Sequence, residues 1–358
     1  MKTVFLKLTN YCTSFCKHCY IPIEKRKQFY ILDIEKLDIV LKKIRNFFKN
    51  EWGLILHGGE ILELELSYLE KVINVLIKNN INNISIQTSF LPLYNNNSKA
   101  KDFFKLVKKS NLNVSTSIDF NGIRKINNSE EIYLNFMKDI IRKFNEETSK
   151  KIISCDVIIT KKNYGNNLFI YKYLSELKLY INHVDLGIYI PYPSLKKDLY
   201  ISFYEYATEL IKYYELDKKN NFLLFGDVFN GIKENIFNKD KNNYYFSCKN
   251  CINDYLVIEP NFDVTICIHE NTVIGNIFND NIIDILTNPK RKEWLRKNLK
   301  RLDFCKNCEF KNICEVCTVN KSIAEKLNIK TKENCPGFYP LLKYISNDIL
   351  NTEKKDNL

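Results

Sequence analysis

Six short runs of β-branched and apolar residues alternate with amphipathic segments through the first 190 residues of this 358-residue chain. The segment ILDIEKLDIVLKKIRNFF shows the helical pattern clearly, because its apolar residues recur every three or four positions and Asp33 is placed to cap its start. Such alternation predicts a parallel sheet with right-handed crossovers. Six units are too few for a closed eight-stranded barrel, so the sequence predicts an α/β fold with a partial (β/α)6 TIM barrel.

The expected elements follow from these patterns. Strands are expected at Val4–Leu8, Gly53–His57, Asn83–Gln87, Asn113–Ile118, Ile152–Ile159 and His183–Ile190. Helices are expected at Ile34–Phe48, Ser67–Lys78, Lys99–Ser110, Ile132–Glu146 and Leu168–Leu177. Since chemistry in parallel α/β folds sits at the carboxyl ends of the strands, functional residues are expected in the loops that follow them.

Three cysteines lie in the loop after the first strand, in the segment YCTSFCKHCY. A tetrahedral zinc site needs four ligands, whereas Cys12, Cys16 and Cys19 supply three. Three cysteines can hold three irons of a cubane cluster and leave the fourth iron open for chemistry. His18 is the alternative fourth zinc ligand, but its position between two of the cysteines would make a strained chelate.

This triplet, with Tyr20 after it, resembles the signature of radical S-adenosylmethionine enzymes. The second strand ends in LHGGE, and Gly58, Gly59 and Glu60 are similar to that family's motif for the methionine amino group. The chemistry agrees, because glycines allow a backbone to approach a ligand closely and a carboxylate pairs with an ammonium.

Two further segments resemble the family more weakly. They place Thr88, Ser117 and Asp119 near the ribose and carboxylate of S-adenosylmethionine, although such side chains also cap helices and turns. The chain departs from the family pattern after this threonine and after GGE, where Ser89-Phe90 replaces Asn-Gly and Ile61 replaces proline.

The family's usual arginine after the fourth strand is also missing. Ser129 stands at its position, so Arg124 or Lys125 is expected to replace it in contacting the ligand's carboxylate.

Eight of the twelve cysteines lie between Cys248 and Cys335, in a region that resembles the C-terminal SPASM extension of this superfamily. The resemblance implies two further 4Fe–4S clusters, three in all. It assigns one to Cys248, Cys251, Cys267 and Cys317, and the other to Cys305, Cys308, Cys314 and Cys335. Zinc is the alternative for the C-x2-C pairs. Two features depart from the common form: the last gap of the quartet Cys305–Cys317 is two residues rather than three, and Phe262 stands where glycine is common.

The expected organisation has four parts. Residues 1–195 form the radical S-adenosylmethionine barrel, 196–240 a helical bridge, 241–340 the SPASM-like domain and 341–358 a C-terminal tail.

The resemblance implies a reaction in which S-adenosylmethionine is cleaved and a hydrogen atom is abstracted from substrate. Members with this extension mostly modify peptides or proteins, which favours maturation of a ribosomally made peptide through a crosslink or an oxidised residue. Expected partners are a peptide or protein substrate, a separate leader-binding protein and a reductase such as flavodoxin or ferredoxin. The alternatives are dehydrogenation of a sugar alcohol, RNA modification, and a non-catalytic electron carrier or zinc scaffold.

No catalytic acid, base or donor stands out. The weak candidates are His57, His269, Glu270 and Cys155, each of which also suits a packing or surface role.

The net charge of +12 has little functional weight, because the 54 basic and 42 acidic residues are spread in short clusters typical of solvated helix faces. No stretch reaches the roughly 18 apolar residues of a membrane span, and no signal peptide precedes the first strand. A cytoplasmic protein is therefore expected, in which clustered cysteines are metal ligands rather than disulfides.

Overall fold

The computed structural model describes residues 2–14, 16–47, 52–191, 196–238, 255–300, 302–314 and 316–356. These residues form two compact units, each discontinuous along the chain. Unit 1 comprises Met1–Val157, Leu179–Val184 and Ile252–Glu293, and unit 2 comprises Ile158–Lys178, Asp185–Cys251 and Trp294–Leu358.

A nine-stranded sheet has the strand order β6-β5-β4-β3-β2-β1-β7-β8-β9. Its first six strands are β1 (Lys2–Thr9), β2 (Trp52–Gly58), β3 (Ile84–Gln87), β4 (Asn113–Ser117), β5 (Ile152–Ile159) and β6 (Ile181–Ile188). β1 to β5 pair in parallel. The predicted α/β fold with alternating strands and helices is therefore confirmed, and the strand bounds agree with the sequence patterns to within two residues.

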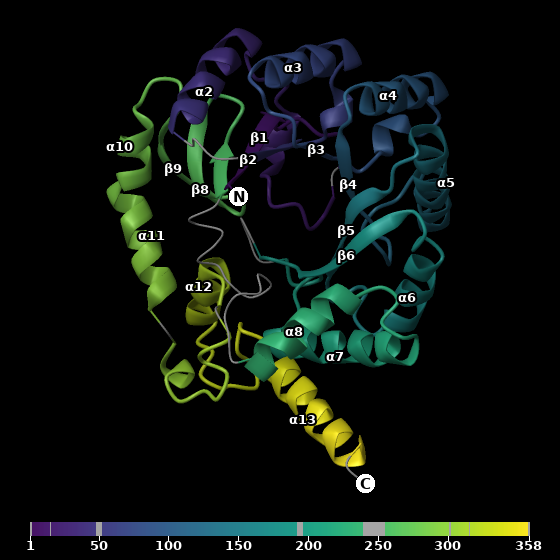
Figure 1. Ribbon diagram of the computed structural model, residues 1–358, viewed down its shortest axis with the longest axis vertical. Coiled ribbons are helices and arrows are strands. Elements are labelled where there is room, and N and C mark those ends of the chain that lie inside the picture. Colours follow the sequence, from purple (N-terminus) through teal and green to yellow (C-terminus); the bar gives the residue numbers. More distant parts are fainter. Residues whose placement is uncertain are drawn as a thin grey trace. The chain divides into compact units, whose positions relative to one another are not determined.

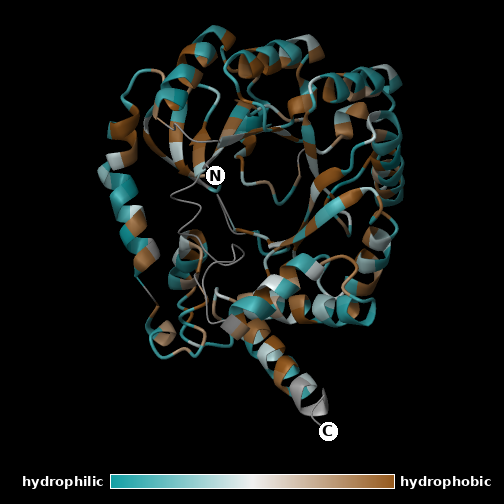
Figure 2. Ribbon diagram, in the orientation of Figure 1, coloured by the Kyte–Doolittle hydropathy of each residue, from teal (hydrophilic) through white to brown (hydrophobic). Residues whose placement is uncertain are grey.

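The helices between these strands lie on the outer side of the sheet in unit 1 (Figure 1). They are α1 (Ile23–Lys27), α2 (Ile34–Phe47), α3 (Leu66–Lys78), α4 (Asn97–Lys109) and α5 (Glu130–Thr148), with the short turns η1 (Ile61–Glu63) and η2 (Leu91–Leu93). In α2 the residues Leu37, Val40, Leu41 and Ile44 are buried, which is the stripe that the sequence predicts. Hydrophobic and hydrophilic residues are interspersed along α2, α3 and α4 in Figure 2.

The sheet of unit 1 has one apolar face and one largely polar face. On β1, Val4 and Leu6 are about 1% exposed and belong to the apolar core. Because side chains alternate along a strand, Phe5 and Lys7 lie on the opposite face. The same alternation places Ser85 and Gln87 of β3 on that second face. Parallel sheets usually bury apolar side chains on both faces, so a largely polar second face is a departure from that pattern.

Three strands from the cysteine-rich part of the chain extend this sheet. β7 (Tyr255–Ile258) pairs in parallel with β1, and β8 (Asp263–Cys267) and β9 (Glu270–Asn276) follow as an antiparallel pair. The helix α10 (Ile282–Thr287) packs against β9 and α2. β7 to β9 therefore belong to the same compact unit as the cysteine loop after β1.

Unit 2 is mainly helical. It contains α6 (Asn167–Ser175), α7 (Phe203–Lys219), α8 (Gly226–Asn238), the turn η4 (Asp303–Cys305), α12 (Thr318–Lys326) and α13 (Tyr339–Asp356), while α11 (Pro289–Leu299) spans the boundary between the units. A capping box between Ser202 and Glu205 begins α7. The hydroxyl of Tyr214 donates to Asp348 at 2.6 Å and ties α7 to α13.

None of the helices in the described parts of the chain is long and apolar enough to cross a membrane.

Two phenylalanines adopt the left-handed backbone conformation at positions where the family resemblance places glycine. Phe90 has φ 61° and Phe262 has φ 67°, and both side chains are buried. The ring of Phe262 packs at 6.0 Å from that of Phe278. Both positions thus adopt a backbone conformation that favours glycine, and burial of the aromatic ring offsets the cost of positive φ.

We predict that Phe262→Gly destabilises the protein by about 2 kcal/mol, since loss of a buried ring costs about 3–5 kcal/mol and relief of the left-handed strain returns about 1–2 kcal/mol. The measurement is the free energy of unfolding in denaturant. Asn328→Gly is the matched control, because Asn328 is exposed with φ 53° and loses no packing. A Phe262→Gly protein as stable as the parent would show that the ring contributes nothing to the turn.

Candidate functional site

The cysteine loop is held against the end of β2 by backbone hydrogen bonds. The N–H of Gly59 donates to the carbonyl of Thr9 at 2.7 Å, and the N–H of Glu60 donates to the carbonyl of Tyr11 at 3.0 Å. A Cβ atom on Gly58 or on Gly59 would lie 2.1 Å from these same carbonyl oxygens. The two glycines are therefore required by the close approach of the cysteine loop, in addition to any role toward a ligand.

The three cysteines of this loop are partly or fully buried. Cys16 is 8% exposed, and Cys12 donates its N–H to the carbonyl of Arg26 at 3.1 Å. A tight turn joins Cys19 to Cys16 through an N–H to carbonyl bond of 3.2 Å. Burial raises the pKa of Cys12 to about 11 and also raises the pKa of Cys16. Thiols in such surroundings become thiolates when a metal replaces the proton.

The side chain of Glu60 is 3% exposed and accepts hydrogen bonds from the chain at every acceptor site. Oε1 accepts from the hydroxyl of Thr88 at 2.6 Å and from the N–H of Leu62 at 3.1 Å. Oε2 accepts from the N–H of Ser89 at 2.8 Å and from the Ser89 hydroxyl. A carboxylate has about four such sites. Glu60 thus ties β2 to the loop after β3, and its contact with the methionine amino group stays a prediction.

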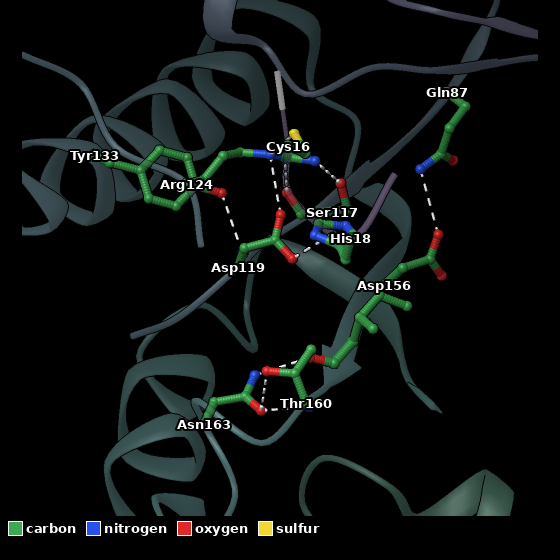
Figure 3. Close-up of polar contacts among 11 residues, drawn as sticks. Cys16, His18, Gln87, Ser117, Asp119, Arg124, Tyr133, Asp156, Thr160 and Asn163 are labelled. Carbon is green, nitrogen blue, oxygen red and sulfur yellow. Dashed lines mark hydrogen bonds and ion pairs between the residues drawn. The ribbon is translucent and has the colours of Figure 1, made fainter. Parts of the chain in front are cut away.

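The loop after β4 brings charged side chains to the cysteine loop (Figure 3). Arg124 is 8% exposed, and its Nε lies 3.1 Å from the Sγ of Cys16 and 3.0 Å from Oδ2 of Asp119. Its two terminal nitrogens donate to the carbonyl and to the hydroxyl of Ser117, each at 3.1 Å. The Nε2 of His18 lies 3.6 Å from Oδ1 of Asp119. The structure therefore brings Ser117, Asp119 and the first cysteine loop together, and their contact with the ribose and carboxylate of a ligand stays a prediction.

Asp119 is a buried carboxylate whose oxygens accept no hydrogen bond within the described part of the chain. Its side chain is fully buried, and its N–H donates to the hydroxyl of Tyr133 at 3.2 Å. A buried acceptor without a donor is costly, so this carboxylate is fitted to a ligand that donates hydrogen bonds. The ribose hydroxyls of S-adenosylmethionine have that chemistry. These residues therefore fit the cofactor that the sequence implies.

A polar cluster lies on the second face of the sheet, beside Tyr20. Lys7 is 2% exposed, and its Nζ lies 2.5 Å from Oε1 of Glu259 and 5.5 Å from the centroid of the Tyr20 ring. His57 pairs in register with Lys7 across β2 and β1. The ring of Tyr20 lies 6.4 Å from that of His57 and 5.1 Å from that of His269.

Both imidazoles of this cluster are neutral at ordinary pH. Burial, with a smaller effect of the Lys7 ammonium, lowers the pKa of His57 to about 3 and that of His269 to about 4. The Nδ1 of His57 accepts the N–H of Gly58 at 2.6 Å. His57 and His269 thus face the same interior as Tyr20, and their catalytic role stays a prediction.

The remaining weak candidate that the structure places is Cys155. It is buried on β5 opposite Thr116 of β4, and it shares a face with Val157. The neighbouring Asp156 lies on the other face, where its carboxylate accepts from Gln87 at 3.3 Å. Cys155 therefore belongs to the apolar side of the sheet. The backbone of Glu270 begins β9, and its side chain lies outside the described atoms.

Four cysteines gather in unit 2. Cys308 donates its N–H to the carbonyl of Cys305 at 3.2 Å, and the Sγ of Cys335 accepts the N–H of Tyr339 at 3.3 Å. Burial raises the pKa of Cys335 to about 11, with smaller contributions from the nearby Cys305 and Cys308. The Sγ–H of Cys314 donates to the carbonyl of Gly337 at 2.7 Å. A Cβ atom on Gly337 would lie 2.9 Å from that sulfur, so the close contact requires glycine.

The assignment of Cys305, Cys308, Cys314 and Cys335 to one cluster stays a prediction. Of the other quartet, Cys248 and Cys251 lie outside the described residues, Cys267 ends β8 in unit 1, and Cys317 precedes α12 in unit 2. Its assignment stays a prediction. Across the described residues no three His, Cys, Asp or Glu side chains are arranged to hold a single metal ion.

The ion pair between Lys7 and Glu259 was not among the expected site residues. Each residue is the one charged position in or directly after an otherwise apolar run, Lys7 in VFLKL and Glu259 in LVIEP. Such an interruption is a usable signal, because lysine and glutamate are almost never fully buried unless paired.

Breaking this pair is expected to be costly. Lys7→Met should lower the free energy of unfolding by about 3–5 kcal/mol, because it leaves the buried Glu259 charge uncompensated. The double variant Lys7→Met/Glu259→Leu should lose less than the sum of the single variants. Denaturant unfolding of all four proteins in oxygen-free buffer measures this coupling.

The exposed pair Lys109–Glu70, at 2.9 Å, provides the control cycle and should show a coupling below about 1 kcal/mol. Additivity within about 0.5 kcal/mol for Lys7 and Glu259 would contradict the assigned pair.

Known proteins resemble this chain in one sequence domain and in the fold. Residues 248–309 match the SPASM family, an iron-sulfur cluster-binding domain. The structure of anSMEcpe, a sulfatase maturase solved with S-adenosylmethionine and the peptide Cp18Cys, superimposes with a TM-score of 0.72 at 18% identity, covering 99% of each chain. SuiB of Streptococcus suis, solved with S-adenosylmethionine, gives a TM-score of 0.61 at 14% identity, covering 93% of this chain and 75% of SuiB.

No curated protein sequence matches the chain. The likeness therefore rests on the fold and on the domain match. The chain has the fold of anSMEcpe and SuiB, and its residues 248–309 match the SPASM iron–sulfur cluster-binding domain.

Proposed function

We propose that this chain is a radical S-adenosylmethionine enzyme that modifies a peptide, with a 4Fe–4S cluster at Cys12, Cys16 and Cys19. The observation that carries the proposal is the meeting of two features on one side of the sheet. One is a three-cysteine loop held by backbone bonds, and the other is the buried carboxylate of Asp119 whose oxygens lack donors in the described structure.

A cluster held by Cys12, Cys16 and Cys19 would supply, with S-adenosylmethionine, the one-electron chemistry for abstracting a hydrogen atom from substrate. The residues of the chain bind and orient that cofactor. The carboxylate of Asp119 accepts hydrogen bonds from the ribose hydroxyls. Hydrogen bonds from Thr88 and Ser89 to Glu60 hold the loops after β2 and β3 together. Burial of Cys16 and Asp119 excludes water from the same place.

The eight cysteines between Cys248 and Cys335 are proposed to bind two auxiliary 4Fe–4S clusters, with the quartets assigned as in the sequence analysis. Full cysteine ligation leaves no open iron, so these clusters move or accept electrons. An electron acceptor in the same chain favours net oxidation of the substrate or formation of a crosslink. We propose that residues 1–195 form the barrel that binds S-adenosylmethionine and that residues 241–340 form the domain that binds the auxiliary clusters.

A peptide substrate is supported by two of the similar structures. anSMEcpe was solved with the peptide Cp18Cys, and SuiB was solved with its precursor peptide SuiA at a TM-score of 0.60 to this chain. We therefore propose a ribosomally made peptide as the substrate class, with a leader-binding protein and a flavodoxin or ferredoxin as partners.

Reconstitution without oxygen should give about twelve irons per chain, four for each cluster. The variant Cys12→Ala/Cys16→Ala/Cys19→Ala should hold about eight and produce no 5′-deoxyadenosine with S-adenosylmethionine and dithionite. Cys155→Ala is the control, because this cysteine is buried on the apolar side of the sheet. Iron analysis and chromatography of the products measure both. A triplet variant that still cleaves the cofactor would overturn the proposal.

The substrate class is tested with three candidates: the peptide encoded by the short reading frame nearest this gene, a sugar alcohol, and a transfer RNA pool. The peptide should increase 5′-deoxyadenosine production and become lighter by two hydrogen atoms in mass spectrometry. Product formation with the sugar alcohol or the RNA alone would replace the peptide in this proposal. Cofactor cleavage by the enzyme would stand in either case.

A further inference from the structure

We propose that Arg124 is a positioning residue for the cysteine-ligated cluster, which it reaches by donating an N–H to the Sγ of Cys16. The inference rests on the proposed function, because it requires a cluster at the cysteine triplet. The Nε of Arg124 lies 3.1 Å from that sulfur, in a contact that buries both side chains. Sequence resemblance suggests a different role for Arg124, in which it binds the carboxylate of S-adenosylmethionine.

The guanidinium of Arg124 is fixed in place by Ser117. One terminal nitrogen donates to the Ser117 carbonyl and the other to its hydroxyl, both at 3.1 Å. These two bonds fix the plane of the guanidinium, so the direction of the remaining Nε–H follows from the fork geometry. Figure 3 shows the side chain reaching between Ser117, Asp119 and Cys16.

The Nε–H points to sulfur rather than to the neighbouring carboxylate. Oδ2 of Asp119 lies 3.0 Å from the same nitrogen, yet neither oxygen of Asp119 accepts a hydrogen bond within the part of the chain that the structure describes. The contact with Asp119 is therefore ionic, while the directed hydrogen bond is made with Cys16. Asp119 keeps its acceptor sites for a ligand at the same time.

A hydrogen bond from a cation to a cluster sulfur favours the reduced cluster. Reduction adds one electron, which increases the negative charge on the sulfur ligands and strengthens the N–H···S bond. Burial limits screening of this hydrogen bond by water and salt, while the ion pair with Asp119 offsets part of the charge of Arg124. Arg124 should therefore raise the reduction potential of this cluster and ease entry of the electron that starts the reaction.

Measurements without S-adenosylmethionine distinguish the two roles of Arg124. A residue that only binds the cofactor's carboxylate changes cofactor affinity and leaves the potential of the cofactor-free cluster alone. A residue that hydrogen-bonds a cluster ligand changes that potential directly. The test therefore measures the cluster without its cofactor.

The experiment is an anaerobic redox titration of the reconstituted full chain, followed by electron paramagnetic resonance. Subtracting the signal of the Cys12→Ala/Cys16→Ala/Cys19→Ala variant, which keeps only auxiliary clusters, isolates the cluster at the triplet. Arg124→Gln should disfavour its one-electron reduction by about tenfold, or about 59 mV, as expected for loss of a charge-assisted hydrogen bond. Arg124→Lys keeps the charge but not the fork, and should give a smaller shift in the same direction.

Lys125→Gln is the matched control, because it removes the same charge from the adjacent, exposed position. Its cluster potential should equal that of the parent. Asp119→Asn should shift the potential upward, opposite to Arg124→Gln, because it removes a buried negative charge near the cluster.

Three outcomes decide the matter. A parental potential in Arg124→Gln, or in Arg124→Lys if the glutamine variant does not fold, overturns the inference and leaves the proposed enzyme intact. A potential shifted equally by Lys125→Gln overturns it as well. If the triplet variant shows the same iron content and signal as the parent, no cluster binds there, and the proposed function fails together with the inference.

Discussion

The backbone contact between the cysteine loop and the end of β2 is the constraint on which the rest of the site depends. Gly59 and Glu60 donate to carbonyls at Thr9 and Tyr11, and the absence of a side chain at Gly58 and Gly59 makes that approach possible. Because the loop is held to a strand of the parallel sheet, its three cysteines lie at the carboxyl ends of the strands. Glu60 then carries the same constraint to the loop after β3 through its four hydrogen bonds.

The polar face of the sheet provides charged and polar side chains next to the cysteine loop. Parallel strands with apolar residues on both faces would leave no place for a charged cofactor. Here one face is packed by helices, and the other carries Lys7 with Glu259, and Ser117 beside Asp119 and Arg124. Burying charge is unfavourable unless each charge has a partner, and the pairs Lys7–Glu259 and Arg124–Asp119 satisfy that requirement. The oxygens of Asp119 are ion-paired but are among the buried acceptors that receive no hydrogen bond from the described residues, and we propose that the cofactor donates to them.

Local patterns were sufficient to predict the alternating strands and helices, because period and capping are properties of neighbouring residues. The family resemblance added Cys12 just after β1, and Gly58 and Ser117 at the ends of β2 and β4. The pairing of β7 with β1 was not predictable in this way, since the two strands are about 250 residues apart and nothing local encodes the partner. The same limit applies to Arg124, because its position in a loop does not predict the direction of its side chain. Phe90 and Phe262 show that a residue that departs from a motif can still adopt positive φ. Burial of each ring offsets the cost of that backbone conformation.

The most direct test of the account is the electron paramagnetic resonance spectrum of the reduced protein before and after addition of S-adenosylmethionine, recorded without oxygen. An open iron at the triplet of Cys12, Cys16 and Cys19 predicts that the signal changes when the cofactor binds to that iron. The same addition to the triplet variant should leave the auxiliary signals as they were. A parent spectrum that the cofactor does not alter, or zinc in place of iron at the triplet, would contradict the account.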